Sequence, residues 1–278
     1  MSVIKNITDI TWVELHEMDK EKTVLFQTIA PVEEHSHHLP LGTDIFEGEY
    51  WRKNAIALLS ERLPDFTFLS MPPLPVACAG ATGFYGNIYY KPQTVKLIVK
   101  ELLENVVSWG IKHTVLIASH ADPVHLIAVE RACDEVNTVH GVCSISPMGT
   151  IFSADELGIN SEVPKSVIEI EQRYPNDFHA GWIETSNMLD IASELVKNCY
   201  HVLPDIEISE HEMMSSACVI SKMSQYGHLG FPRLADRLLG SKLNQNMAAN
   251  LAMATLAFVE RKNYQQYCHN FLYDRIKI

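Results

Sequence analysis

His113-Thr114-Val115-Leu116-Ile117-Ala118 is a short run of mostly apolar residues. A strand with apolar side chains on both faces is typical of the interior of a parallel sheet that is covered on both sides. Further strands are expected at residues 23–30, 66–71 and 139–145. We therefore predict a sheet with residues 113–118 near its centre.

Helix-forming segments separate these strands. Apolar residues recur at helical spacing over residues 45–61 and 92–109, and a third helix is expected to begin at Asp122-Pro123. This alternation of strands and helices predicts right-handed crossovers and a mostly parallel sheet with helices on both faces. The predicted fold class is therefore α/β.

The pattern changes after about residue 149. A single domain that spans residues 1–278, with a decorated C-terminal third, is the simplest account of the change. Within that third we expect loops and short elements over 149–176, a helix over 187–197, an irregular stretch over 200–233 and a last helix over 243–261.

Composition and charge limit the expected binding partners of the protein and its expected location in the cell. The formal net charge is -12, and the chain has no dense run of Lys or Arg. Nucleic acids and anionic membrane surfaces attract basic proteins, so neither is an expected partner. No apolar stretch is long enough to span a bilayer. The six cysteines form no CxxC pair and no secretory signal is present, so we expect reduced thiols and a cytoplasmic protein.

Acidic and imidazole side chains gather where the predicted strands end. Ligands of open parallel sheets bind outside the carboxyl ends of the strands, so residues that are distant in sequence can meet there. Zn²⁺ and Mn²⁺ accept imidazole and carboxylate ligands, and a site without cysteine favours these harder donors. The candidate residues are Glu33, His35, Asp44, His120, Asp122, His179 and Glu184.

The number of acids suits two ions better than one. Two neighbouring ions need a bridging carboxylate to offset their repulsion, and a water shared between them becomes a hydroxide near neutral pH. Because side chains alternate along an extended chain, Glu33 and His35 would point to one ion each, and Glu34 would face away.

Each candidate also has a purely structural interpretation. Asp44 could cap the helix that follows it, and Asp122 followed by Pro123 is the usual start of a helix. His179 could be a buried histidine of the core. His37 and His38 could belong to a solvated loop.

Three motifs resemble those of the creatininase (creatinine amidohydrolase) family. Residues 33–44 follow the family's E-x-H-x-x-H-L-P-x-x-T-D run, and residues 179–186 are similar to its H-A-G-x-x-E-T-S. A weaker match lies at residues 230–240. The order and spacing of the motifs suit the family from about Ile10 to Phe258.

The resemblance implies a three-layer α/β/α sandwich, often a homo-oligomer and in particular a hexamer, that hydrolyses a small molecule with two divalent ions, Zn or Mn. By motif, Glu33 and His120 would hold one ion, His35 and Asp122 the other, and Asp44 would bridge them. His179 and Glu184 would position the attacking water or move its proton, and Glu184 is also a candidate metal contact. His38, Tyr85 and Trp182 are candidates for substrate contact, and Tyr89 and Tyr90 are further candidates for lining a pocket. All four aromatic residues could equally be core or subunit contacts.

The chain departs from the family pattern near the expected substrate. Asp122 stands where creatininase has a glutamate, Ala121 replaces an aromatic residue, and residues 143–155 contain no tryptophan. The expected substrate is therefore a cyclic amide, a formamide or a related C–N compound rather than creatinine. A catalytically degenerate assembly or binding protein is the alternative. A flavodoxin-like nucleotide-binding protein is disfavoured, because no Gly-rich phosphate loop follows the first strand.

Overall fold

The sheet of the computed structural model has five parallel strands in the order β1-β3-β2-β4-β5. The structure describes residues 2–80, 83–154, 157, 163, 165–213 and 215–278. The strands are β1 (Val3–Asn6), β2 (Thr23–Ile29), β3 (Thr67–Ser70), β4 (His113–Ala118) and β5 (Ser144–Ile145). The expected parallel sheet is confirmed, and β4 has the predicted bounds.

The two longest strands lie side by side inside the sheet. β2 pairs with β4 from Val24 opposite His113 to Ile29 opposite Ala118, and every residue of both strands is buried. A central strand without a polar face is what the apolar run at 113–118 predicted.

Two edge strands differ from the expectation. The strand predicted at 139–145 is present but much shorter, because the preceding helix continues to His140 and only Ser144–Ile145 pairs with β4. The edge strand β1 was not expected, since its side chains are mostly exposed and show no apolar pattern.

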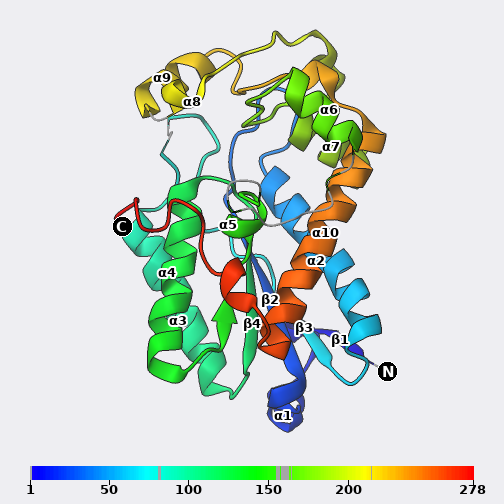
Figure 1. Cartoon of the computed structure of the whole chain (residues 1–278), viewed down its shortest axis with the longest axis vertical. Coiled ribbons are helices and arrows are strands. Elements are labelled where there is room, and N and C mark those ends of the chain that lie inside the picture. Colours follow the sequence, from blue (N-terminus) through cyan, green and yellow to red (C-terminus); the bar gives the residue numbers. More distant parts are fainter. Residues whose placement is uncertain (1, 81–82, 155–156, 158–162, 164, 214) are drawn as a thin grey trace.

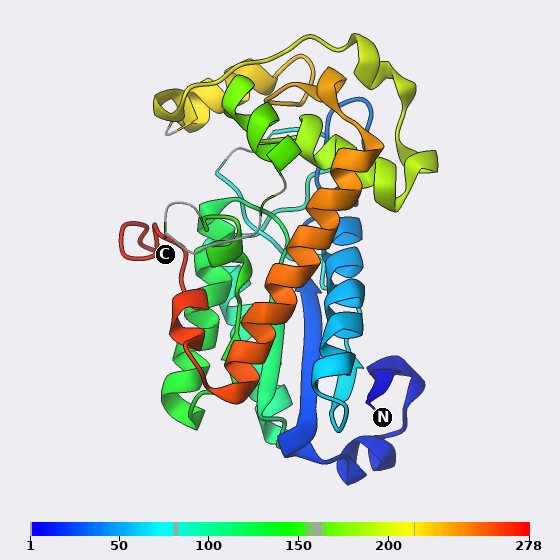
Figure 2. The same ribbon diagram turned by 45° about the vertical axis from the view of Figure 1, so that its right-hand side comes forward.

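Helices cover both faces of the sheet, as the three-layer prediction required (Figures 1 and 2). α3 (Pro92–Ser108) packs against α4 (Pro123–His140) on one face. α2 (Thr43–Arg62) packs against α10 (Arg237–Glu260) on the other. The remaining short helices outside the C-terminal third are α1 (Trp12–Glu17) and the 3₁₀ helices Ile7–Asp9 and Lys20–Lys22.

Within the C-terminal third, α6 to α9 lie beyond the carboxyl ends of the strands, at the top of Figure 1, whereas α10 runs back along α2. Helix α7 begins five residues before the predicted 187, and α10 begins at Arg237 rather than at 243 because Asp236 caps it. The elements are α5 (Met148–Ile151), α6 (Lys165–Arg173), α7 (Trp182–Ile191), α8 (Glu210–Met213), α9 (Ser216–Met223) and the 3₁₀ helices Ser193–Leu195, Asn198–Val202, Pro232–Leu234 and Tyr264–Tyr267.

Gly240 sets how closely α10 approaches α7. A Cβ atom at this position would lie 1.8 Å from the Ser186 carbonyl oxygen, which is far inside contact distance. Only glycine therefore lets the two helix backbones meet there. None of the described helices is long and apolar enough to cross a membrane.

Candidate metal centre

Four of the predicted ligands lie directly beyond the strand ends. β2 ends at Ile29, and the segment that follows carries Glu33 and His35. Asp44 is in the first turn of α2, and His120 comes just after β4. All four side chains are buried, so they form one site at the carboxyl edge of the two central strands.

Glu33, Asp44 and His120 form the first group of potential ligands. His120 Nδ1 lies 3.0 Å from Glu33 Oε2 and 3.6 Å from Asp44 Oδ2. A metal ion between these atoms would have two carboxylate ligands and one imidazole ligand, which suits Zn²⁺ or Mn²⁺.

His35, Asp44 and Glu184 form the second group. His35 Nε2 lies 3.5 Å from Asp44 Oδ1 and 3.7 Å from Glu184 Oε2. Asp44 therefore turns one oxygen to each group, which is the arrangement that a bridging carboxylate requires.

Several polar atoms of the two groups lack hydrogen-bond partners among the described residues and could instead bind cations. Glu33 Oε2, Asp44 Oδ2 and His35 Nε2 are buried and have no hydrogen-bond partner within the described part of the chain. Buried polar atoms without partners are costly, and metal ions are one way in which proteins satisfy them. The donor set therefore fits divalent metals.

The pKa shifts of the ligand residues also indicate a site that requires positive charge. Burial alone would lower the pKa of His120, but Glu33 and Asp44 raise it to about 10. Burial would raise the pKa of Glu33, but the charge of His120 holds that pKa well below its ordinary value. In the absence of a metal ion, the carboxylates favour protonated, positively charged imidazoles. A bound metal ion would supply that positive charge instead.

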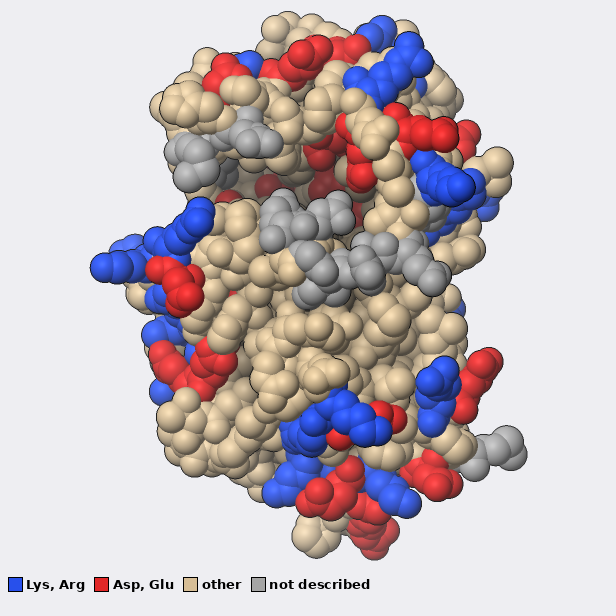
Figure 3. Space-filling view, viewed as in Figure 1, with Lys and Arg blue, Asp and Glu red and all other residues tan. Residues whose placement is uncertain are grey.

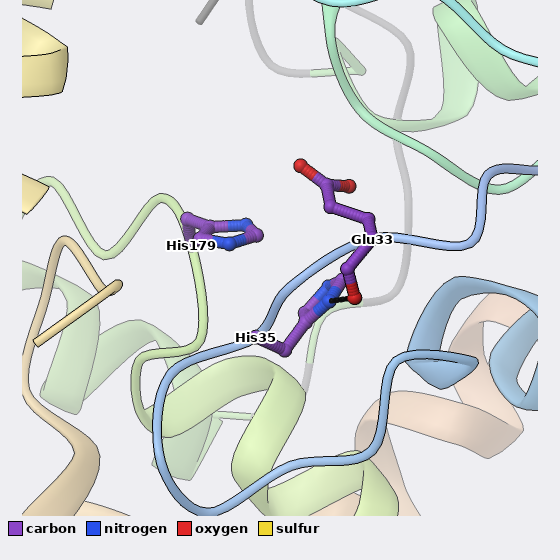
Figure 4. Close-up of side chains that lie close together, drawn as sticks. All are labelled: Glu33, His35 and His179. Atoms are coloured by element: carbon purple, nitrogen blue, oxygen red, sulfur yellow. Dashed lines mark hydrogen bonds between the residues drawn. The ribbon is translucent and has the colours of Figure 1, made fainter. Parts of the chain in front are cut away.

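His179 lies beside both groups and forms a third group of potential ligands with Glu33 and His35. Its ring is 4.5 Å from the ring of His35, and Figure 4 shows it pointing toward the segment that carries Glu33 and His35. Its Nε2 is 2.8 Å from the carbonyl oxygen of Glu34, to which it donates. His179 is thus a fixed side chain of the site rather than a remote core histidine.

The loop before α7 is shaped by Asp177. The Asp177 carboxylate accepts hydrogen bonds from the backbone N–H groups of Trp182 and Ile183. A Cβ at Gly181 would lie 1.9 Å from Asp177 Oδ1, so this loop requires glycine there. Glu184 follows one turn into the helix and accepts from Ala180 N–H, which fixes its carboxylate beside His35.

Glu34 belongs to none of the ligand groups found among the described residues, but it does not face away as expected, because its Oε1 lies 3.6 Å from His179 Nε2. Its Oε2 accepts a hydrogen bond from Ser36 N–H at 3.0 Å, while its carbonyl accepts from His179. Ser36 has a φ of 61°, and its hydroxyl donates to the Tyr226 carbonyl at 2.6 Å. Glu34 and Ser36 therefore hold the ligand loop in place.

Asp122 takes a different position from the one implied by the resemblance. Its Oδ1 accepts from Val124 N–H at 2.7 Å, and its Oδ2 accepts from Gly80 N–H at 2.8 Å. Asp122 is the N-cap of α4 and enters none of the ligand groups that the described residues form. The structure brings Glu184 to His35 and Asp44 instead.

A cavity lies beside the metal centre, and the three predicted substrate contacts do not line it. His38 is fully buried, and its Nε2 lies 2.7 Å from Thr185 Oγ1. Tyr85 is completely exposed, at 101%. Trp182 packs in an apolar cluster with Phe231, which is the core alternative left open for it. None of the three is among the described residues that line the cavity.

Tyr89 and Glu47 adjoin the centre without having been predicted as site residues. The hydroxyl of Tyr89, which the sequence marked only as a general pocket candidate, donates to Glu33 Oε1. Burial, and next the charge of Glu184, raise the pKa of Glu47 well above its ordinary value. Glu47 lies three residues after Asp44 on α2, so the helical repeat was a signal that could have identified it.

A cavity of about 420 Å³ opens beside the ligands. His179 and Glu184 line it together with Glu47, Ser119 and Asn187, and its walls also include apolar side chains. Figure 3 shows acidic side chains inside a hollow of the surface. A cavity of this size next to a metal centre suits a small molecule.

Comparison with known proteins identifies related folds. The family model for creatininase, described as creatinine amidohydrolase, matches residues 8–255. No curated protein matches the sequence. A structure of creatinine amidohydrolase (creatininase) is 17% identical, with a TM-score of 0.65 over 90% of this chain and 95% of that one.

The names of two other similar structures mention metals. A structure named creatininase Mn is 19% identical, with a TM-score of 0.65 over 91% of this chain and 97% of that one. A mutant creatininase of the Zn–Zn type is 17% identical, with a TM-score of 0.64 over 90% of this chain and 96% of that one. These identities are low, so the likeness concerns the fold. The family model, however, covers most of the sequence, and the chain belongs to the creatininase (creatinine amidohydrolase) family.

Proposed function

We propose that the chain hydrolyses an amide-like C–N bond of a small molecule with two divalent ions. Glu33, Asp44 and His120 would hold one ion, and His35, Asp44 and Glu184 the other. The observation that carries the proposal is that Asp44 directs its two oxygens to two different ligand groups. Two such ions supply a hydroxide near neutral pH and polarise a carbonyl group.

The proposed ligand set revises the one implied by the family motifs. Glu184 replaces Asp122 at the second ion, because both oxygens of Asp122 already accept backbone hydrogen bonds. The mixture of carboxylate and imidazole donors suits Zn and Mn alike. Similar folds are known in Mn and Zn–Zn forms, which supports the choice of these two metals.

His179 is the residue that we assign to proton transfer. Its Nε2–H donates to the Glu34 carbonyl, so the neutral ring has its lone pair on Nδ1. Nδ1 would then take a proton from the nucleophile and give it to the leaving nitrogen. Glu184, which accepts from Ala180 N–H, keeps a fixed place between His35 and the cavity.

The substrate that we propose is a cyclic amide, a formamide or a related C–N compound rather than creatinine. Ala121 lines the cavity where the family pattern has an aromatic residue, and residues 143–155 have no tryptophan to place over a substrate. We also propose a homo-oligomer in the cytoplasm, a hexamer by resemblance, and sedimentation of the purified protein would test the assembly.

Metal analysis of protein purified without chelator tests the centre. We expect two ions per chain in the wild type, about one in Glu184→Gln and almost none in Asp44→Asn, because Asp44 serves both groups. Asp122→Asn is the matched control and should keep both ions, since an asparagine can still cap α4.

Three outcomes would contradict the proposal. Wild-type protein that neither contains nor binds a divalent ion would exclude the two-metal mechanism. Loss of one ion in Asp122→Asn together with full occupancy in Glu184→Gln would restore the ligand set implied by the motifs. Full metal content without turnover on a panel of cyclic amides and formamides would favour the alternative of a binding or assembly protein.

A further inference from the structure

Glu47 is a buried acid that the proposed mechanism does not use. It lies one helical turn after Asp44 on α2, so both side chains project from the same face of the helix. Asp44 faces the metal ligands, and Glu47 lines the neighbouring cavity. Only 3% of Glu47 is exposed, so its carboxyl group is part of the cavity wall rather than of the outer surface.

A chain of buried hydrogen bonds fixes this acid. Asn187 Nδ2 donates to Glu47 Oε1 at 2.8 Å, and this is the one hydrogen bond to Glu47 among the described residues. The Asn187 carbonyl accepts from Asn244 Nδ2 at 3.2 Å, and Asn244 Oδ1 accepts from Trp51 Nε1 at 2.9 Å. Side chains from α2, α7 and α10 thus hold Glu47 in one orientation, which is what a recognition site requires.

Asn187 contributes a second acceptor. Its Nδ2 is directed to Glu47, and its Oδ1 is buried without a hydrogen-bond partner within the described residues. Asn187 is 3% exposed and also lines the cavity. A carboxylate and an amide oxygen therefore lie next to each other, both able to accept and neither supplied with a full set of donors.

The charge of the cavity wall complements a cation. The described lining residues include Glu47, Glu171, Asp177 and Glu184 but no Lys or Arg. Asp177 already accepts three backbone hydrogen bonds, and Glu184 belongs to the second ligand group. Glu171 is exposed, so Glu47 is the buried acid of this set that has neither role, and a buried carboxylate is stabilised by a paired cation.

We infer that Glu47 and Asn187 recognise a cationic nitrogen group of the substrate that carries at least two N–H donors, such as an amidinium. One N–H would meet the Glu47 carboxylate and another the Asn187 Oδ1. The inference rests on the proposed function, because it places this group in the cavity of the same hydrolytic site. It makes Glu47 a specificity residue rather than a catalytic one.

Benzamidine and benzamide are a suitable pair of probes, since they have nearly the same shape and differ in charge. Titration calorimetry on the Mn²⁺-loaded protein should show benzamidine binding about tenfold or more tightly than benzamide, the usual gain from a charged hydrogen bond. Glu47→Gln should remove this preference. Glu171→Gln changes an exposed acid of the same cavity and should retain it.

Metal content measured on the same samples separates this inference from the proposed function. Two ions per chain with no preference for benzamidine would overturn the role of Glu47 and leave the metal centre intact. A preference that survives in Glu47→Gln would overturn it as well. A protein without metal that still prefers benzamidine through Glu47 would support the recognition site and contradict the proposed hydrolysis. If Glu47→Gln does not fold, a wild-type protein that binds both probes equally would still overturn the role of Glu47.

Discussion

Gly240→Ala should separate α7 from α10 and weaken the second ligand group. The new Cβ would lie 1.8 Å from the Ser186 carbonyl oxygen. Atoms in contact need about 3.5 Å, so α7 would have to move by about 1.7 Å. Overpacking of this kind costs about 3 kcal/mol, and alanine returns about 1 kcal/mol through its helix propensity.

The net loss of about 2 kcal/mol corresponds to a fall of about 3 to 4 °C in melting temperature for a chain of 278 residues. Calorimetry of chelated protein would measure it, with Leu238→Ala, an exposed neighbour on the same helix, as the control that should change little. Because α7 carries Glu184, Gly240→Ala should also bind its second Mn²⁺ more weakly than its first. A variant that melts at or above the wild-type temperature would refute the packing argument.

Three further perturbations test single contacts. Tyr89→Phe removes the hydrogen-bond donor to Glu33 and should weaken Zn²⁺ binding at one metal site about tenfold in a competition titration. An unchanged affinity would show that Tyr89 does not support the metal centre. Asp122→Ala removes a helix cap and should lower the free energy of unfolding in urea by about 1 kcal/mol without changing metal content. The third concerns pH: the pKa of His120 is raised to about 10 in the folded chain, so its contribution to stability is complete below about pH 6.5 and is lost as the pH rises through about 10. Chelated protein should therefore lose stability between pH 7 and 10, and a flat profile would contradict the charge pairing at His120.

The central strands could be predicted because a strand that is buried on both faces is a dense run of apolar residues. The error at 139–145 has the opposite origin. Val139 is 72% exposed and Val142 is 40% exposed, so the apolar residues that suggested a strand lie at the surface. Gly141, with a φ of 80°, then ends α4 where a strand had been expected. A single sequence does not reveal which apolar residues remain exposed.

The ligands near strand ends could also be predicted, because the chain direction of a parallel sheet places them at one edge. Glu33, His35 and Asp44 required only that rule and the spacing of the motif. The place of Glu184 depends on the packing of α7 against α2 and α10, which no local pattern specifies. Asp122 shows the reverse case, since the local Asp-Pro signal for a helix cap described its contacts better than the family motif did.

Helix α2 links the two proposals made for this site. Asp44 in its first turn would bridge the ions, and Glu47 one turn later would select the substrate. Ser119 Oγ donates to the Asp44 carbonyl at 2.7 Å, and a Cβ at Gly48 would come within 2.6 Å of both Ser119 Oγ and Thr28 Cγ2, so the helix start is held closely on β2 and β4. Both acids therefore take their positions from the same strand ends, but only Asp44 contacts the metal ligands. Substitution at position 47 should consequently change which substrate binds while leaving the metal content unchanged.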